Sequence, residues 1–463
     1  MDRMVAVILA AGQGKRMKSA QPKVMQPLLG LPMIEYAVRA AERAGAEQVL
    51  VVVPPEGEAI QAYLGERCTY VVQPEPRGTG DALRQVEPLL PQGATLWVLY
   101  GDMPRLEPAL LEAVRAEHRR TRATATLTSM EPADPHGYGR IVRSAEGDFL
   151  AVVEEADADE RTRSIREVNA GLYVFESGPL FRALGEVEPR NAQGEYYLVD
   201  ALPRIRQAGG RVEVWRAGRR EEFEGVNDRR QLAEAERWLR RRIADSWMER
   251  GVTVVDPEST WIGPDVEIGP DARIEPMCWL LGRSRVGAGA RVGPGVHLVE
   301  SEVGAGAQVF FSVVESSRIG PGAQVGPFAH LRPGSELAEG ALVGNFAEVK
   351  NSRVGPGTKI HHHSYIGDAR LGAGVNIGAG VVTVNYDGRK KHVTEIGDGA
   401  FIGCNANLVA PLHVGEHAYV AAGSTLTRDV PPWALAIARE RQTNKAEWAR
   451  RRADDAGSGE ESR

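Results

Sequence analysis

The chain has few cysteines and no long apolar run. Its 463 residues include 3 cysteines, Cys68, Cys278 and Cys404, and they form no Cys-x-x-Cys pair. This scattered, odd set excludes a disulfide framework and a cysteine-based zinc site, and it indicates a reducing compartment, the cytoplasm. No stretch approaches the roughly 18 apolar residues of a membrane span, so we expect no membrane insertion. A formal net charge of −6 gives no general attraction to nucleic acid.

Glycine, by contrast, is abundant, with 52 residues, and a six-residue repeat in the second half of the chain explains the excess. This period fits neither a helix nor an alternating strand, and it is typical of a parallel β-helix whose interior is filled by one aliphatic residue in six. The repeat is carried by three runs of aliphatic residues, Ile262, Ile268, Ile274, Leu280, Val286, Val292 and Leu298, then Ile319, Val325, Leu331, Leu337, Val343 and Val349, then Ile396, Ile402, Leu408, Val414, Val420 and Leu426.

The first half instead alternates apolar strands with amphipathic helices, a pattern that predicts a doubly wound α/β domain with a mostly parallel sheet over residues 1–228. The expected strands are Val5–Leu9, Gln48–Val53, Tyr70–Val72, Thr95–Leu99, Thr124–Thr128, Leu172–Phe175 and Arg211–Trp215, and the expected helices are Pro32–Ala44, Asp81–Leu90 and Pro108–Arg119.

Three further segments complete the predicted organisation. Residues 229–249 contain no Gly or Pro and predict a linker helix whose arginines form a solvated face. The β-helix is expected from about residue 252 to 429, inside a second domain of residues 250–463 that ends in an arm. Its largest interruption, Asn385–Glu395, predicts a projecting loop. The charged end, about 450–463, is expected to be disordered.

A glycine-rich loop follows the first strand directly. Gly12 and Gly14 free the backbone to curl around an anion, and Arg16 and Lys23 add two cations within reach of a triphosphate. Met17 stands where the dinucleotide fingerprint needs a third Gly, and no Walker Lys-Ser/Thr pair is present, so neither of those motifs applies.

Asp102 ends the fourth predicted strand, at the sheet edge where doubly wound domains bind ligands. By itself it is equally compatible with a helix or turn cap. Beside the glycine-rich loop, an Mg²⁺ site is favoured, because Mg²⁺ takes only one or two protein oxygens. Gln73, Gly78 and Thr79 form a second polar loop after another strand.

The loop Leu9-Ala10-Ala11-Gly12-x-Gly14-x-Arg16-Met17, followed by Pro22-Lys23, resembles the sugar-1-phosphate nucleotidyltransferase family over nearly all of residues 1–228. Further matching segments are Gly137-Tyr138-Gly139-Arg140-Ile141, Val153-Glu154-Glu155, Asn169-Ala170-Gly171 and Glu224-Gly225-Val226-Asn227.

The resemblance implies attack of a sugar-1-phosphate on the α-phosphorus of a nucleoside triphosphate, with release of pyrophosphate. It implies that Asp102 and Asn227 hold Mg²⁺ and that Arg16 and Lys23 face the phosphates. The implied nucleotide and sugar contacts are Leu9, Ala10, Ala11, Gly12, Lys23, Gln73, Gly78, Thr79, Tyr100, Gly101, Asp102, Gly139, Glu154, Asn169 and Asn227.

A second set of polar residues interrupts the repeat. It comprises Arg332, Lys350, His361, His362, His363, Tyr365, Asn376, Asn385 and Tyr386. Arg332 and Lys350 have the spacing of one coil and should stack, whereas Lys350 and His362 fall on different sides of the prism and would meet only across a groove between subunits. A neutral imidazole is a natural base near neutral pH. Surface decoration and an intersubunit zinc site are the alternatives for the histidines.

These residues resemble the hexapeptide-repeat acyltransferases and, with the first half, the bifunctional enzymes that join a glucosamine-1-phosphate N-acetyltransferase to an N-acetylglucosamine-1-phosphate uridyltransferase. The segments that carry the resemblance are Arg332-Pro333-Gly334, Gly344 to Lys350, His362 to Tyr365, Asn376 to Gly380 and Asn385 to Gly388. The resemblance covers both halves and implies a left-handed β-helix, a homotrimer, and acetyl-CoA and UTP as co-substrates for the synthesis of UDP-N-acetylglucosamine, a precursor of bacterial envelope glycans.

The resemblance also assigns roles within the repeat. It implies that His362 is the base that deprotonates the glucosamine amine and that Arg332 and Lys350 clamp the sugar phosphate. It implies sugar contacts from Tyr365 and Asn376, contacts to the sugar and acetyl group from Asn385 and Tyr386, and acetyl-CoA contacts from Ala379, Asn385, Tyr386, Cys404, Ala422 and Arg439.

Four positions depart from the pattern of the family. Asp81 stands where His is common, Ala156 where Lys is expected, Cys404 where Ser is frequent and Arg441 where Pro is usual. None is a proposed base or metal ligand, so both activities are expected, with altered substrate affinity. The alternative function is a single nucleotidyltransferase whose β-helix only assembles or regulates the protein.

Overall fold

The computed structural model describes residues 3–12, 14–217 and 221–457. The chain divides into two compact units, Met1–Ile243 and Ala244–Arg463, which are described separately. Within the described part, no helix combines the length and the apolar character needed to cross a membrane.

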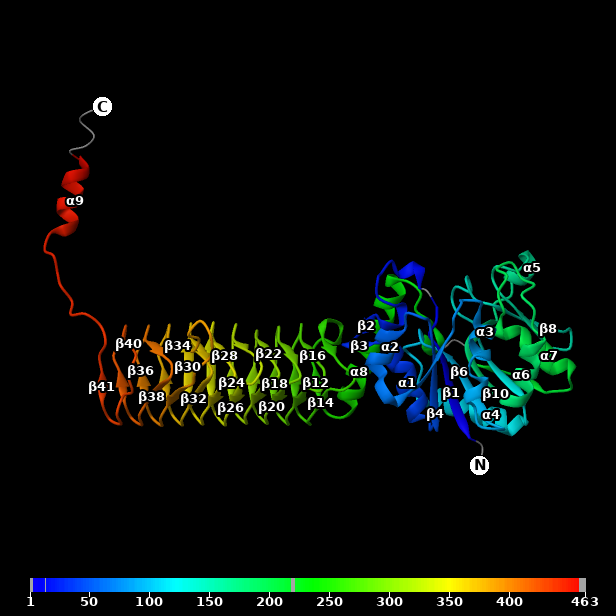
Figure 1. Cartoon of the computed structure of the whole chain (residues 1–463), viewed down its shortest axis with the longest axis horizontal. Coiled ribbons are helices and arrows are strands. Elements are labelled where there is room, and N and C mark those ends of the chain that lie inside the picture. Colours follow the sequence, from blue (N-terminus) through cyan, green and yellow to red (C-terminus); the bar gives the residue numbers. More distant parts are fainter. Residues whose placement is uncertain (1–2, 13, 218–220, 458–463) are drawn as a thin grey trace. The chain divides into compact units, whose positions relative to one another are not determined.

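The first unit is built on one sheet with the strand order β11-β7-β10-β6-β1-β4-β5, and β8 and β9 form an antiparallel extension (Figure 1). All neighbouring pairs along this order are parallel except those of β10, which runs antiparallel to both β6 and β7. The mostly parallel sheet is therefore confirmed. The strands are β1 (Met4–Leu9), β4 (Gln48–Val53), β5 (Thr69–Val72), β6 (Thr95–Tyr100), β7 (Ala125–Met130), β8 (Arg140–Arg143), β9 (Phe149–Val153), β10 (Val168–Glu176) and β11 (Val212–Arg216), with a separate hairpin of β2 (Pro27–Leu28) and β3 (Leu31–Pro32).

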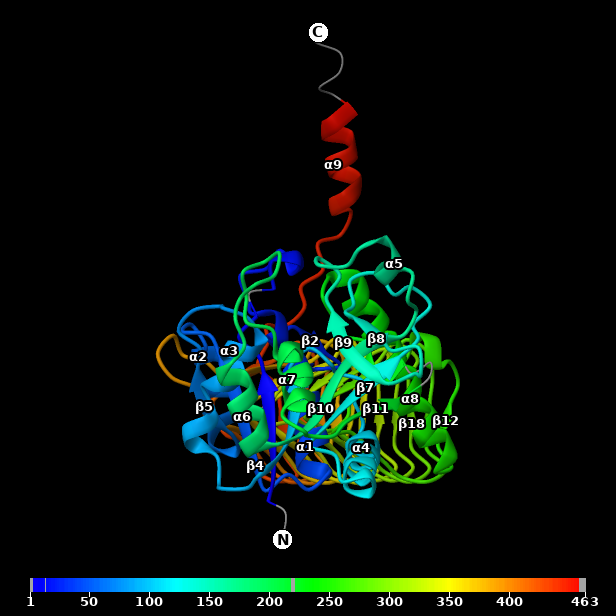
Figure 2. The same ribbon diagram turned by 90° about the vertical axis from the view of Figure 1, so that its right-hand side faces the viewer.

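Helices flank the sheet (Figure 2). They are α1 (Met33–Arg43), α2 (Glu58–Leu64), α3 (Thr79–Arg84), α4 (Pro108–Thr121), α5 (Glu160–Arg163), α6 (Ser177–Gly185) and α7 (Ala201–Gln207). The longer helix α8 (Arg229–Glu249) follows them and crosses the boundary between the two units. The helix expected over Asp81–Leu90 is shorter, because α3 ends before Pro88 and a separate turn follows at Glu87–Leu89.

Both faces of the sheet are buried, which explains why its strands are continuous apolar runs. In β1, Ala6 and Ile8 enter one core together with residues of α1 and α4, while Val5 and Val7 enter the opposite core with residues of α3, α6 and α7. Burial on both sides fixes the register of β1 and thereby the position of the loop that follows Leu9.

The second unit is a parallel β-helix with three sheets, and some of its strands are labelled in Figure 1. One sheet holds β12 (Thr253–Val254), β15 (Arg273–Ile274), β18 (Arg291–Val292), β21 (Gln308–Val309), β24 (Gln324–Val325), β27 (Leu342–Asn345), β30 (Lys359–His362), β33 (Asn376–Ile377), β36 (Phe401–Ile402), β39 (Tyr419–Val420) and β41 (Leu435–Ala436). The next holds β13 (Trp261–Ile262), β16 (Trp279–Leu281), β19 (His297–Val299), β22 (Val313–Glu315), β25 (His330–Leu331), β28 (Glu348–Lys350), β31 (Tyr365–Gly367), β34 (Val382–Val384), β37 (Asn407–Val409) and β40 (Thr425–Leu426). The third holds β14 (Glu267–Ile268), β17 (Arg285–Val286), β20 (Glu302–Val303), β23 (Arg318–Ile319), β26 (Glu336–Leu337), β29 (Arg353–Val354), β32 (Ala369–Leu371), β35 (Thr394–Ile396) and β38 (Leu412–Val414).

The aliphatic positions of the six-residue period fill the interior of this β-helix. Every residue of the three predicted runs is buried, and Ile268, the most exposed of them, is only 8% exposed. Strands pair in parallel with the strand one coil later, as in Trp261 with Trp279 and His330 with Glu348. The stacking predicted from the sequence is therefore confirmed, although some coils are one or two residues shorter.

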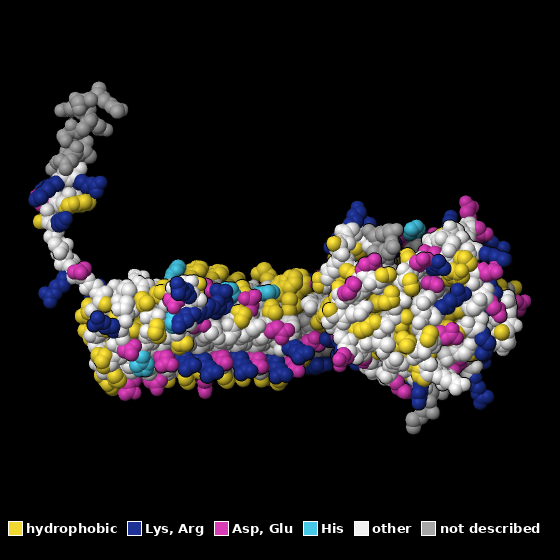
Figure 3. Space-filling view, in the orientation of Figure 1, with side chains coloured by type: hydrophobic (Ala, Val, Ile, Leu, Met, Phe, Trp, Pro, Cys, Tyr) yellow, Lys and Arg dark blue, Asp and Glu magenta, His cyan; other side chains and the backbone are white. Residues whose placement is uncertain are grey.

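The third sheet of the β-helix carries alternating charges on its outer side. Figure 3 shows acidic and basic side chains in turn along the lower edge of the β-helix. Arg285 pairs with Glu267 at 3.1 Å, and Arg353 pairs with Glu336 at 3.2 Å, each across neighbouring coils. The side chains are largely exposed, so each pair contributes at most about 1 kcal/mol to stability.

The end of the chain differs from its expectation. Residues 450–463 were expected to be disordered, but α9 (Trp448–Gly457) makes them helical as far as Gly457. Residues 458–463 lie outside the described part. The helix is explained by its composition, because Ala and Arg are strong helix formers and no β-branched residue interrupts them.

Candidate active sites

A cavity of about 640 Å³ lies at the carboxyl edge of the sheet in the first unit. It is reached from the ends of β1, β5 and β6, the strands that precede the predicted loops. Its lining includes most of the predicted nucleotide contacts, namely Leu9, Ala10, Ala11, Gly12, Arg16, Lys23, Gln73, Gly78, Thr79, Tyr100, Asp102 and Asn227. Gly101 is buried, and its amide donates to the carbonyl of Leu9 at 3.0 Å, so it joins two of these strand ends.

Two oxygens and two cations meet in this cavity. The ammonium of Lys23 is paired with the Asp102 carboxylate and lies 3.2 Å from Oδ1 of Asn227, which also accepts a hydrogen bond from Arg16 at 3.0 Å. Asp102 and Asn227 therefore direct oxygens at one cationic nitrogen. An anionic and a neutral oxygen converging in this way suit Mg²⁺, so the residues fit the ion that the sequence implied.

The backbone brings these two oxygens together from distant parts of the chain. Asp102 follows β6, and its carbonyl accepts a hydrogen bond from the amide of Val226 at 2.9 Å. Gly225 lies so close that a β-carbon there would approach Asp102 Oδ1 to 3.5 Å. The segment before Asn227 is thus held directly against the Asp102 loop.

Gln73 is oriented by Asp81 and by the backbone of Gly78. Its Nε2 donates to Oδ2 of Asp81 at 2.8 Å and to the carbonyl of Gly78 at 3.2 Å. Because both partners are acceptors, they fix the amide nitrogen of Gln73 and with it the orientation of Oε1. The hydroxyl of Thr79, beside them, accepts from the amide of Leu198 at 3.0 Å.

A smaller cavity of about 280 Å³ adjoins the first and shares Thr79 and Tyr100 with it. Glu154 lines it, and so does Ala156. Burial, together with nearby Asp200 and Asp157, raises the pKa of Glu154 to about 7.

The other predicted sugar contacts lie near Glu154 but are not among the residues that line the cavity. Gly139 leaves room for Glu154, whose Oε1 would be 3.1 Å from a β-carbon at this position. Asn169 donates from its backbone to the Gly139 carbonyl at 2.8 Å and from Nδ2 to the Tyr173 hydroxyl at 2.6 Å.

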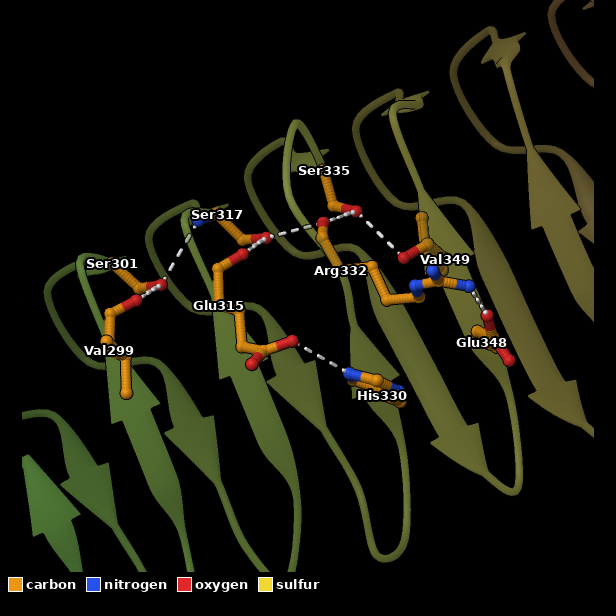
Figure 4. Close-up of polar contacts among 9 residues, drawn as sticks. All are labelled: Val299, Ser301, Glu315, Ser317, His330, Arg332, Ser335, Glu348 and Val349. Atoms are coloured by element: carbon orange, nitrogen blue, oxygen red, sulfur yellow. Dashed lines mark hydrogen bonds and ion pairs between the residues drawn. The ribbon is translucent and has the colours of Figure 1, made fainter. Parts of the chain in front are cut away.

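In the second unit, Arg332 is anchored by side chains of neighbouring coils (Figure 4). Its Nη1 donates to Oε1 of Glu348 at 2.8 Å, and its carbonyl accepts from the hydroxyl of Ser335 at 2.7 Å. Ser317 also lies 3.0 Å from that carbonyl. The guanidinium is therefore fixed on the outer side of the second sheet.

Lys350 lies one coil beyond Arg332, in β28, and a further lysine comes close to it. The neighbouring Lys391 and, to a smaller extent, Arg332 lower the pKa of Lys350. Lys391 belongs to the 385–395 loop and is held by a bridge to Tyr386. Three cations in one place are suited to binding an anion such as a phosphate.

Tyr365 and Asn385 lie beside this group. Tyr365, in β31, occupies the same sheet and pairs in register with Glu348. Gly367 leaves room for both side chains, because a β-carbon there would lie 2.5 Å from the Tyr365 hydroxyl and 2.7 Å from Asn385 Nδ2. Asn385 is buried and paired with Asp368, whereas Tyr386 is 57% exposed.

His362 lies at the end of β30, at the corner between the first and second sheets, and is exposed. Its Nδ1 is 2.6 Å from Oδ1 of Asn345 on the preceding coil. Because an amide oxygen only accepts, the neutral imidazole that donates to it carries its proton on Nδ1 and has its lone pair on Nε2. His363 instead stacks on Phe346 with ring centroids 5.0 Å apart, and burial, together with neighbouring His362, lowers the pKa of His361.

Four of the predicted acetyl-CoA contacts, Ala379, Cys404, Ala422 and Arg439, form a column at the same corner. The His362 carbonyl accepts from the amide of Gly380, next to Ala379. The Ala379 carbonyl accepts from Asn405, next to Cys404, and the Cys404 carbonyl accepts from Gly423, next to Ala422. Arg439 lies beside Gly423, with Cδ 3.7 Å from the position of a β-carbon there.

Two predicted residues stand apart from these groups. Asn376, in β33, lies on the first sheet and pairs in register with Lys359 and Phe401. Arg441 is exposed. Among the described residues, no three His, Cys, Asp or Glu side chains gather closely enough to hold a metal ion, so His361–His363 do not form a zinc site within one chain.

Sequence reasoning assigned no role to Asn345, Glu348 or Lys391. Asn345 and Glu348 were part of quoted motifs, and the coil spacing placed Asn345 beside His362, so that signal was present. Lys391 could not be found from its spacing, because the loop breaks the period.

The fold and sites define a nucleotidyltransferase joined to a hexapeptide-repeat transferase. Residues 6–172 match the model of the MobA-like NTP transferase domain, and residues 394–428 match that of the bacterial transferase hexapeptide. The chain is 47% identical to the bifunctional protein GlmU of Brevibacillus brevis over 97% of this chain and 98% of that protein. It is 47% identical to the same-named protein of Heliobacterium modesticaldum, over 96% and 97%, and 46% identical to that of Caldanaerobacter subterraneus, over 98% and 99%. The chain therefore belongs to the GlmU family of bifunctional enzymes, which combine uridyltransferase and acetyltransferase activities.

Proposed function

We propose that the two units catalyse consecutive steps in the synthesis of UDP-N-acetylglucosamine. The second unit acetylates glucosamine-1-phosphate with acetyl-CoA, and the first transfers UMP from UTP to the product and releases pyrophosphate. This division assigns residues up to about 228 to uridyl transfer, residues 250–463 to acetyl transfer and the intervening α8 to the connection.

In acetyl transfer, Nε2 of His362 accepts a proton from the sugar amine as the amine nitrogen attacks the thioester carbonyl carbon. The C–S bond then breaks and coenzyme A leaves. Arg332, Lys350 and Lys391 bind the sugar phosphate, and Tyr365, Asn376, Asn385 and Tyr386 contact the sugar and the acetyl group. The observation that supports this assignment is the corner column, which leads from His362 along Ala379, Cys404 and Ala422, small side chains that leave space for an extended cofactor.

In uridyl transfer, an oxygen of the sugar phosphate attacks the α-phosphorus of UTP, and the bond to the leaving pyrophosphate breaks. There is little covalent chemistry for the protein to perform, so positioning and charge neutralisation dominate. Arg16 and Lys23 neutralise the phosphates, and the cavity around Glu154 receives the sugar. Asp102 and Asn227 would hold Mg²⁺, which supplies further neutralisation; their convergence on Lys23 supports this assignment.

We also propose a homotrimer in the cytoplasm, the compartment that supplies UTP and acetyl-CoA. His362 and the cations belong to different sheets of one prism, which favours a site shared between subunits. Light scattering should give three times the chain mass of 50.2 kDa. Mixed and reassembled His362→Ala and Arg332→Ala proteins should regain acetyl transfer if the site is shared, and none if each chain has a complete site.

The decisive test is an assay with glucosamine-1-phosphate, acetyl-CoA and UTP, each omitted in turn, on the wild type and two variants. His362→Ala should lower acetyl transfer by about 10² to 10⁴-fold, the usual contribution of a general base, and leave uridyl transfer unchanged. Asp102→Ala should do the reverse and remove the dependence on Mg²⁺. Undiminished acetyl transfer in His362→Ala would contradict the assignment of the base, and no acetyl transfer by the wild type would leave a single-function nucleotidyltransferase. Retained activity in Asp102→Ala would contradict the metal assignment.

A further inference from the structure

Arg105 is a buried cation just outside the first cavity. Its side chain is only 6% exposed, and Nη1 donates to Oε2 of Glu224 at 2.6 Å. The guanidinium also lies over the ring of Trp238 in α8, 5.9 Å from its centroid, while its Nε has no hydrogen-bond partner among the described residues. A charge buried with incomplete hydrogen bonding lowers stability unless its ion pair offsets the loss of water.

The ion pair joins the two segments that supply the proposed metal ligands. Arg105 lies three positions after Asp102, and Glu224 lies three positions before Asn227. Between these residues the amide of Val226 donates to the Asp102 carbonyl at 2.9 Å. The segments are therefore joined by one backbone hydrogen bond and by the Arg105 side chain, which pairs with Glu224 and also donates from Nη1 to the Glu221 carbonyl at 3.4 Å.

Neither Arg105 nor Glu224 lines the cavity, so neither is placed to touch a substrate. Their contribution is to hold the two backbone segments together. If the two segments separated, the oxygens of Asp102 and Asn227 would no longer converge on one cation, although both residues would still be present.

We propose that Arg105 is a positioning residue for uridyl transfer, which acts through Glu224 to hold the Asp102 and Asn227 segments together. This inference rests on the proposed metal site. Whether Arg105 holds the two segments together does not depend on a bound metal. It is measured separately, by hydrogen exchange without ligands.

The test compares Arg105→Met, which keeps the apolar stem, with Arg105→Lys, which keeps the charge. In Arg105→Met, hydrogen exchange of the Val226 amide should be about tenfold faster without ligands, and half-maximal uridyl transfer should need about tenfold more Mg²⁺, since a hydrogen bond between charged groups contributes about 1.4 kcal/mol or more. Arg105→Lys should recover part of both effects. Acetyl transfer by the same protein should be unchanged.

The matched control is Arg67→Met. Arg67 is also paired with carboxylates, Glu35 at 2.9 Å and Glu42 at 2.7 Å, and it does not line either cavity. The Arg67→Met substitution should lower the melting temperature without changing hydrogen exchange at the Val226 amide or the Mg²⁺ requirement. Adding Glu224→Gln to Arg105→Met should cause little further change in the exchange rate of Val226 or in the Mg²⁺ requirement. Both substitutions break the same ion pair, so their effects should not add.

Three outcomes separate the possibilities. Faster exchange at Val226 together with a raised Mg²⁺ requirement supports the proposal. Unchanged exchange, with a loss of melting temperature like that of Arg67→Met, overturns it and leaves Arg105 a purely structural residue. Faster exchange with an unchanged Mg²⁺ requirement overturns its role in uridyl transfer, and if Asp102→Ala is also fully active, the fault lies in the metal assignment itself.

Discussion

The two units build their sites by opposite means. In the first, loops at the ends of β1, β5 and β6 and the segment before α8 meet at one sheet edge, so neighbours such as Arg16 and Asn227 are 211 residues apart in sequence. In the second, neighbours such as Asn345 and His362 are 17 residues apart, about one coil. In a solenoid, residues one coil apart in sequence are neighbours in space. In a doubly wound sheet, the packing of the helices brings the loops together.

This difference predicts unequal tolerance of small backbone changes, and the largest effect is expected for Gly344→Ala. A β-carbon at Gly344 would lie 2.2 Å from the carbonyl oxygen of His361 on the next coil, so the coils would have to separate. We expect the second unit to lose about 3 kcal/mol or more and acetyl transfer to be largely lost, with uridyl transfer unchanged. Denaturation followed by separate assays of the two activities would measure this.

Gly340→Ala is the control for that change. Gly340 has φ +63°, but a β-carbon there would meet nothing within 4 Å, so only backbone strain of about 1 kcal/mol is expected. If the two variants were equally stable, close contact between coils would not be what holds His361 and His362 in place.

A smaller effect, and one that depends on pH, is expected in the first unit from Glu154→Gln. Because the folded-state pKa of Glu154 is raised from 4.5 to about 7, the folded protein binds its proton more tightly than the unfolded chain does. Stability is therefore lost as pH rises from about 4.5 to 7, by at most about 3 kcal/mol. Glu154→Gln should remove this loss. Relative to the wild type, the variant should therefore be more stable in the first unit at pH 8 but not at pH 4.

Thermal melting across this pH range would check the prediction, with the sugar affinity measured in parallel. Glu155→Gln is a suitable comparison, since the Glu155 pKa is lowered, with Arg140 as its ion-pair partner, and its substitution should have the opposite dependence on pH. A pH-independent difference between Glu154→Gln and the wild type would contradict a raised pKa.

The smallest effect is expected from Asn345→Leu, which removes the acceptor for Nδ1 of His362. Acetyl transfer should fall about tenfold in kcat, because the imidazole loses the hydrogen bond that fixes its tautomer and orientation. Asn345→Asp keeps an acceptor and should remain closer to the wild type.

Asn407→Leu provides the matched control, because the Asn407 side chain also projects from a coil and donates from Nδ2 to the Thr425 hydroxyl at 3.3 Å. It should leave acetyl transfer unchanged. Equal losses in Asn345→Leu and Asn407→Leu would mean that general disturbance of the coils, rather than orientation of His362, explains the effect.

Much of the β-helix site could be predicted from spacing. The coil period places Arg332 and Lys350 in one column and His362 on another side, as the structure has them. The coil period does not place Lys391, because the 385–395 loop lengthens the coil to which it belongs. Arg370 accordingly pairs with Glu395, which lies 25 residues later. The coil period also gives no information on α9, which lies beyond the repeat. Its many charges led us to expect disorder, but its composition favours a helix.

By itself, the sequence determined the interior of the β-helix and the strands of the sheet, because burial imposes a period that apolar residues must follow. It also supplied the chemical groups of both sites through local motifs. Only the tertiary structure decided which long-range pairs form, such as Lys23 with Asp102 and Arg105 with Glu224. Each of these contacts depends on where loops end in space, and a loop has no period from which its end point could be read.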